Sequence, residues 1–105
     1  MRISAVVVSP TPVVLGAPVD IAVFVEGVRL SREVEICVAV GWPFEIEGRA
    51  MLCKAVPGSS SLSVAFRSRL TAKAIATRCQ ITVLADAADD QGAKASEIVD
   101  VIGAL

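Results

Sequence analysis

Residues 19–40 read VDIAVFVEGVRLSREVEICVAV, and this stretch decides the fold. Apolar and polar or small residues alternate on both sides of Gly27, which gives two apolar rows: Val19, Ile21, Val23 and Val25, then Val34, Ile36, Val38 and Val40. Period-two alternation of β-branched residues is typical of strands with one buried face. A six-residue connection, residues 27–32, separates the two segments. We therefore expect a hairpin or two neighbouring strands of one sheet.

Similar segments recur along the rest of the chain and are separated by turn residues. Further strands are expected near residues 3–8, 50–56, 62–66, 75–85 and 95–102. Residues 67–78, RSRLTAKAIATR, place Leu70, Ala74 and Thr77 at helical spacing, which allows one short helical crossover near residues 67–74. The sequence thus predicts one domain, residues 1–105, built as an all-β, antiparallel sandwich of about seven strands.

Charge and composition argue against several classes of function. The net charge is −1 and the 10 Lys and Arg are scattered, whereas a nucleic-acid binder shows a basic face. No apolar stretch approaches the ~20 residues that span a bilayer. The chain is expected to be cytoplasmic if it is complete as given, and extracellular if it is a fragment of an exported protein. The sequence contains no His, no Asn and only Gln80 and Gln91; a scarcity of thermolabile amides is typical of hyperthermophile proteins, although a GC-rich coding bias has the same effect.

The three cysteines are Cys37, Cys53 and Cys79. Cys37 and Cys53 are 16 positions apart around Glu45, so antiparallel pairing through a turn at 44–48 would bring them together. A disulfide between them is favoured over three buried thiols, and Cys79 is expected to be a core residue. Without His, neither a structural zinc site nor a catalytic cysteine is expected.

One acidic turn is a weak metal candidate. Asp86, Asp89 and Asp90 gather oxygen ligands that calcium could use, but their spacing does not match the helix–loop–helix calcium pattern. An ordinary polar hairpin turn is the alternative, and it is favoured.

Two of the four aromatic residues lie close together in the sequence. Trp42 and Phe44 flank Pro43. If they are exposed, they form a candidate interaction patch, because Trp is enriched at the centres of interfaces. If they are buried, they cap one end of the sandwich, and this second alternative is favoured.

Two longer stretches carry a family resemblance. The opening VVVSPTPVVLGAPVDIAVFVEG (residues 6–27) and the closing ITVLADAADDQGAKASEIVDVI (residues 81–102) resemble the first strands and the last hairpin of bacterial and archaeal immunoglobulin-like modules. The likeness covers about half of the chain, and the antibody-type Cys…Trp…Cys arrangement is missing because Trp42 follows Cys37 at the end of a strand. The resemblance implies an immunoglobulin-like sandwich.

The resulting functional hypothesis is a non-catalytic protein-interaction or structural domain, which binds a protein partner or assembles with copies of itself. No enzyme activity and no cofactor are expected. Two alternatives remain open: an accessory or regulatory subunit of a larger enzyme complex, and a calcium- or carbohydrate-dependent surface module.

Overall fold

The computed structural model describes residues 1–27, 33–57, 63–87 and 92–103. Within these ranges the chain is all-β, with nine strands and no helix. In chain order the strands are β1 (Arg2–Ser9), β2 (Val13–Val14), β3 (Val19–Glu26), β4 (Glu33–Val40), β5 (Phe44–Ile46), β6 (Met51–Pro57), β7 (Ser63–Ala72), β8 (Ala76–Ala87) and β9 (Ala93–Ile102). A helix capable of crossing a bilayer is therefore absent from the described part of the chain.

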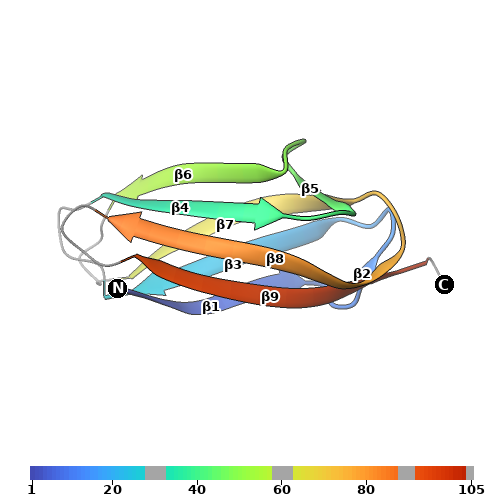
Figure 1. Ribbon diagram of the computed structural model, residues 1–105, viewed down its shortest axis with the longest axis horizontal. Helices are drawn as coiled ribbons and strands as arrows, with labels where there is room; N and C mark the ends of the chain where they lie inside the picture. The colour runs from blue at the N-terminus through green and yellow to red at the C-terminus, as the bar shows by residue number, and fades with distance from the viewer. Residues whose placement is uncertain (28–32, 58–62, 88–91, 104–105) are drawn as a thin grey trace.

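The strands form two sheets that pack face to face (Figure 1). One sheet has the order β1-β3-β7-β5 and the other has the order β2-β9-β8-β4-β6. The prediction of an all-β chain with two packed sheets is confirmed. Nine strands are found rather than about seven because β2 and β5 have only two and three residues, too few for alternation to reveal them.

The two strands predicted within residues 19–40 do not pair with each other. β3 lies in the four-stranded sheet and β4 in the five-stranded sheet, so the expected hairpin or neighbouring pair at residues 19–40 is wrong. Each strand buries its apolar row. The two rows belong to opposite sheets and pack into the same hydrophobic core. Hydrophobic alternation specifies which face is buried, but it does not specify the neighbour along the sheet edge.

The helical crossover expected near residues 67–74 is also wrong. Residues 63–72 form the single strand β7, which pairs with β3 on one side and with β5 on the other. Phe66 and Leu70 are buried while Arg67 and Arg69 are exposed, which is the period of a strand. Pairing on both edges outweighs a local helical spacing, as tertiary context commonly does.

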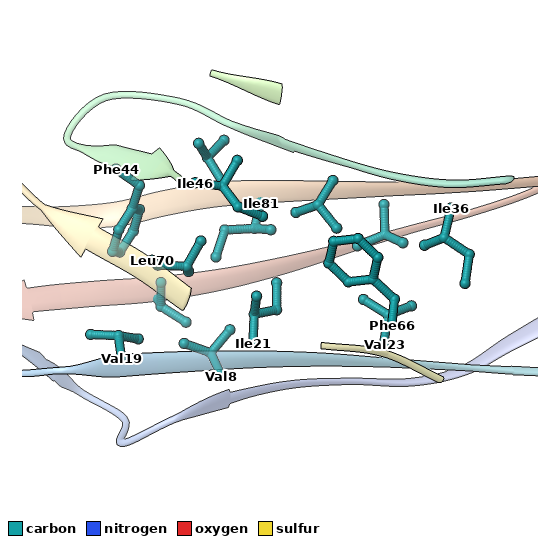
Figure 2. Close-up of a cluster of buried hydrophobic side chains, with 14 of the residues drawn as sticks. Val8, Val19, Ile21, Val23, Ile36, Phe44, Ile46, Phe66, Leu70 and Ile81 are labelled. Atoms are coloured by element: carbon teal, nitrogen blue, oxygen red, sulfur yellow. The ribbon is translucent and has the colours of Figure 1, made fainter. Parts of the chain in front are cut away.

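The core lies between the sheets and is aliphatic apart from Phe44, Phe66 and Cys79. Figure 2 shows side chains from β3, β4, β5, β7 and β8 meeting in it. Its largest fully buried members are Phe66, Ile21, Ile36, Ile46 and Ile81. Each contributes about 1.5–3 kcal/mol by leaving water. Because the core takes only the inward rows, the outward rows of β4, β6, β8 and β9 remain available for a functional site.

Candidate functional site

The disulfide joins Cys37 of β4 to Cys53 of the edge strand β6. Figure 1 shows these two strands side by side. β4 and β6 are antiparallel, and their register places the two cysteines directly opposite each other. Ile36 and Val38 turn inward, so Cys37 and its partner turn outward. The disulfide suggested by the cysteine spacing is therefore present, on the outer face of the five-stranded sheet. Cys53 is exposed and Cys37 is half-buried.

A carboxylate lies beside this disulfide. Glu35 precedes Cys37 by two residues and therefore shares its outward face. Its Oε1 lies 3.7 Å from Cys37 Sγ. Sulfur in a disulfide carries no proton, so this is a contact in the oxidised protein, whereas a reduced Cys37 thiol could donate a hydrogen bond to the carboxylate. One Glu35 oxygen and the two sulfurs all lie within 4.8 Å of one another.

The surface around the disulfide is largely apolar. Met51 and Leu84 are 52% and 43% exposed, which is high for large apolar side chains. Leu84 of β8 pairs with Cys37, and Met51 of β6 pairs with Ala39. We use the term disulfide face for the outward side chains of Glu35, Cys37, Ala39, Met51, Cys53, Leu84 and Asp86. An attacking group would reach the sulfurs across this surface.

The disulfide face carries negative charge at one end. Glu35 pairs directly with Asp86 of β8, so two exposed carboxylates lie on adjacent strands. Like charges directly opposite each other in a sheet repel. Lys94 of β9 pairs with Leu84 and is the neighbouring cation in the next strand. The two carboxylates outnumber this one cation, so the local charge near the sulfurs favours the approach of cations over anions.

Lys54 follows Cys53 but belongs to a different environment. Its Nζ lies 3.4 Å from Glu47 Oε2 and 5.1 Å from the centre of the Phe66 ring. Ser68 Oγ donates a hydrogen bond of 2.6 Å to the same Glu47 oxygen. This hydrogen bond is the main reason that the pKa of Glu47 is lowered, and the nearby Lys54 and Arg49 act in the same direction against an opposing desolvation. Lys54 is thus engaged away from the disulfide face.

The third cysteine is separate from this site. Cys79 is buried in the core, as the sequence suggested. Burial raises the pKa of the Cys79 thiol, and the charge of Asp100 raises it further. A thiol that stays protonated is a poor nucleophile. Chemistry at the disulfide face is therefore not expected to involve Cys79.

Of the remaining candidate residues, the structure describes Trp42, Phe44 and Asp86. Trp42 is 75% exposed whereas Phe44 is 4% exposed, so the favoured capping role is wrong for Trp42, and the two aromatics do not form one surface patch. Asp86 is exposed and lies on the disulfide face. Asp89 and Asp90 lie outside the described residues, so the weak calcium candidate and the favoured polar hairpin turn both stay predictions.

The sequence interpretation missed Glu35, Met51 and Leu84. The signal for Glu35 was present, since a Glu-x-Cys spacing in an alternating strand places both side chains on one face. Met51 and Leu84 could not be found in the same way. Their position next to the cysteines depends on the β4–β6 and β4–β8 registers, which the sequence does not state.

Comparison with known proteins gives a structural neighbour but no family. No family model matches the chain, and no curated protein matches it. Among solved structures, the fold is similar to that of the superoxide reductase (neelaredoxin) from Ignicoccus hospitalis, with a TM-score of 0.56 and 19% identity over 93% of this chain and 79% of that one. At this identity the likeness concerns the fold.

This neighbour corrects three expectations drawn from the sequence. The assignment to immunoglobulin-like modules is not supported, because the similar sandwich is that of a superoxide reductase. The non-catalytic interaction role and the expected absence of enzyme activity are overturned by the same finding, since the neighbour is named as a redox enzyme. The reason for the error is physical: alternation and turns specify a sandwich, but sandwiches of different families share both features. The chain is thus a two-sheet sandwich similar in fold to a superoxide reductase.

Proposed function

We propose that this chain is a thiol–disulfide redox protein and that the pair Cys37–Cys53 is its redox-active group. The observation that carries the proposal is the position of the disulfide on the outer face at an edge strand, with Cys53 exposed. A purely structural disulfide does not need to be exposed to solvent, whereas thiol–disulfide exchange requires access for an attacking thiolate. The structural neighbour is named as a redox enzyme, but at 19% identity it supports the fold alone, so the thiol chemistry rests on the disulfide itself.

The reaction proceeds in two exchange steps. The thiolate of a substrate attacks Cys53 Sγ, the Sγ–Sγ bond breaks, and Cys37 leaves as a thiolate that takes a proton from water. A second substrate thiolate then attacks the substrate sulfur of the mixed disulfide and releases Cys53. The protein disulfide gains two electrons and two protons, and two substrate thiols become one disulfide. The reverse sequence reoxidises the protein.

Burial determines which sulfur is attacked. Cys53 is on the edge strand and is exposed, whereas Cys37 has β6 on one side and β8 on the other. An attacking thiolate must approach along the S–S axis from outside, so Cys53 is the accessible end. Glu35 lies beside Cys37, the leaving sulfur, and its negative charge repels the thiolate that forms there.

A resident redox-metal centre of the kind that reduces superoxide fits the oxidised donor set poorly. Reduction of superoxide to peroxide takes one electron, which redox metals supply, and such metals are held by imidazole or by thiolates. The sequence has no His. Among the described residues the one cluster of three ligand-type side chains is Glu35, Cys37 and Cys53, and its two sulfurs are bonded to each other. We therefore propose thiols and disulfides as substrates rather than superoxide.

The preferred substrate class follows from the surface. Met51 and Leu84 offer apolar contact, while Glu35 and Asp86 repel anions. Uncharged or cationic thiols with an apolar body are therefore favoured over anionic thiols such as glutathione.

The test is reduction of the folded protein. Native protein treated with dithiothreitol should expose two thiols that react with a chromogenic reagent while circular dichroism keeps its β signal, and oxidised dithiothreitol should close the pair again. The variant Cys79→Ala should give the same two thiols, because they come from the disulfide. The proposal is wrong if the thiols become reactive only when the sandwich unfolds.

A further inference from the structure

The geometry points to a second state of the disulfide face: once reduced, Cys37 and Cys53 together with Glu35 form a binding site for a soft, thiophilic cation of the zinc group. This inference rests on the proposed function, because it needs the disulfide to be reduced in the folded protein. The two activities are otherwise independent, since a redox pair need not bind metal.

Three ligand atoms are already gathered on one rigid surface. The Glu35 oxygen and both sulfurs lie within 4.8 Å of one another. A tetrahedral zinc ion at about 2.3 Å from each sulfur would set the sulfurs roughly 3.8 Å apart. The register of β4 and β6 keeps the cysteine Cα atoms 4.0 Å apart, so side-chain rotation would open the sulfurs to that spacing without moving the strands.

The donor types select the class of cation. Two thiolates are soft ligands that favour zinc or copper(I) over magnesium or calcium. The carboxylate adds a third, charged ligand. Cys53 is exposed, so water can supply the fourth position, as in zinc sites with three protein ligands.

The surrounding charge favours occupation by a cation. Glu35 and Asp86 are cross-strand partners of like charge. A bound cation would offset their repulsion. Lys54, the cation next in sequence to Cys53, is held at Glu47 and does not compete for the site.

The chemistry balances with reagents that can be named. A phosphine reductant delivers two electrons to the disulfide and takes up oxygen from water, and the protein gains two thiol protons. The cation then replaces those two protons. Oxidation of the thiols back to the disulfide expels the cation, so the site would exist in only one redox state.

Cadmium titration followed by the ultraviolet thiolate-to-metal absorption band tests the inference on the full chain. The phosphine-reduced protein should bind one Cd²⁺ per chain, and the oxidised protein should bind none. Glu35→Gln should weaken binding by at least the roughly tenfold that even an outer-shell change causes. Glu33→Gln is the matched control, because Glu33 lies on the same strand face two residues further away and should keep binding within about twofold. Cys53→Ser should abolish the stoichiometric band, whereas Cys79→Ala should retain it.

Free thiols counted in the same samples separate the two proposals. If two thiols are free in the folded protein and no Cd²⁺ binds, the metal site is wrong and the redox function stands. If the disulfide resists the phosphine in the folded protein, both are overturned. Equal weakening by Glu35→Gln and Glu33→Gln would remove Glu35 from the site.

Discussion

Cys53 lies directly opposite Cys37 across the β4–β6 ladder, with 4.0 Å between the two Cα atoms. This spacing is closer to the ~4.5 Å of a non-hydrogen-bonded cross-strand pair than to the ~5.5 Å of a hydrogen-bonded one. The two cysteines are held by the sheet register itself. Their proximity therefore does not depend on the bond between them, and the oxidised and reduced states can share one backbone.

The two cysteines should differ in reactivity. In Cys37→Ser the remaining Cys53 thiol is exposed, and in Cys53→Ser the remaining Cys37 thiol is half-buried beside Glu35. Exposure and greater distance from the Glu35 carboxylate both favour attack by a thiolate. The Cys53 thiol left in Cys37→Ser should therefore react several-fold faster with a chromogenic disulfide reagent than the Cys37 thiol left in Cys53→Ser. Both variants carry the Cys79→Ala change so that one thiol is counted. Equal rates would contradict the assignment of Cys53 as the attacked sulfur.

Loss of the disulfide should weaken the fold without abolishing it. The chain-entropy relation gives about 3 kcal/mol for a loop of about 15 residues, and the two cysteines are 16 positions apart. The double variant Cys37→Ala/Cys53→Ala should lose about this free energy of unfolding in urea. Wild-type protein unfolded under reducing conditions is the matched comparison and should show a similar loss. Complete unfolding of the reduced protein in water would contradict reversible redox cycling.

Thiol charge should affect the rate of reduction. Near the carboxylates of Glu35 and Asp86, cationic cysteamine should reduce the disulfide faster than anionic glutathione, relative to their rates with a small unhindered disulfide. Glu35→Gln should raise the glutathione rate by roughly two- to fivefold, because one repelling charge next to the leaving sulfur is removed.

Two controls accompany the rate measurement. Glu33→Gln removes the same charge further along the strand and should change the rate less. At about 1 M salt the Debye length falls to roughly 3 Å, so the advantage of cysteamine should largely disappear. An advantage that survives such salt would assign the preference to shape instead of charge.

The Ser68–Glu47 hydrogen bond predicts a pH dependence of stability. The pKa of Glu47 is lower in the folded protein than in a free Glu side chain, mainly because Ser68 donates to its carboxylate. A lowered folded-state pKa gives stability that is present above the unfolded pKa and is lost as the pH falls through the folded pKa. Ser68→Ala should therefore lower the free energy of unfolding more at pH 7 than at about pH 2.5.

Urea unfolding of Ser68→Ala at both pH values measures the difference. In a Glu47→Gln background the effect of Ser68→Ala should no longer depend on pH, since the titrating group is gone. A pH dependence that persists in this background would assign it to another carboxylate.

Trp42 and Phe44 should respond in opposite ways to substitution. Trp42 is 75% exposed, so Trp42→Ala should change the free energy of unfolding by no more than about 0.5 kcal/mol. Phe44 is 4% exposed in the core, so Phe44→Ala should cost about 3–5 kcal/mol. Acrylamide quenching of the single Trp in the folded wild type checks the exposure directly. Weak quenching would restore the capping role that the sequence favoured.

The sequence by itself determined the buried face of residues 19–25 and 34–40 and which two cysteines could meet. The rows Val19–Val25 and Val34–Val40 are buried as their alternation predicts, because a period-two row places all its apolar side chains on one face of the strand. The Cys37–Cys53 pairing agrees with antiparallel symmetry about Glu45, although residues 44–46 form strand β5 of the other sheet in place of the expected turn.

The tertiary structure alone decided strand neighbours and the composition of the disulfide face. β3 and β4 lie in different sheets, residues 67–74 are mostly strand rather than helix, and Leu84 and Asp86 join Cys37 and Glu35 through the β4–β8 register. These contacts join residues far apart in the chain, and alternation is the same whichever strand lies alongside. Packing of the whole core decides which strands pair. Only the folded sandwich therefore places the carboxylates of Glu35 and Asp86 and the apolar side chains of Met51 and Leu84 around the disulfide.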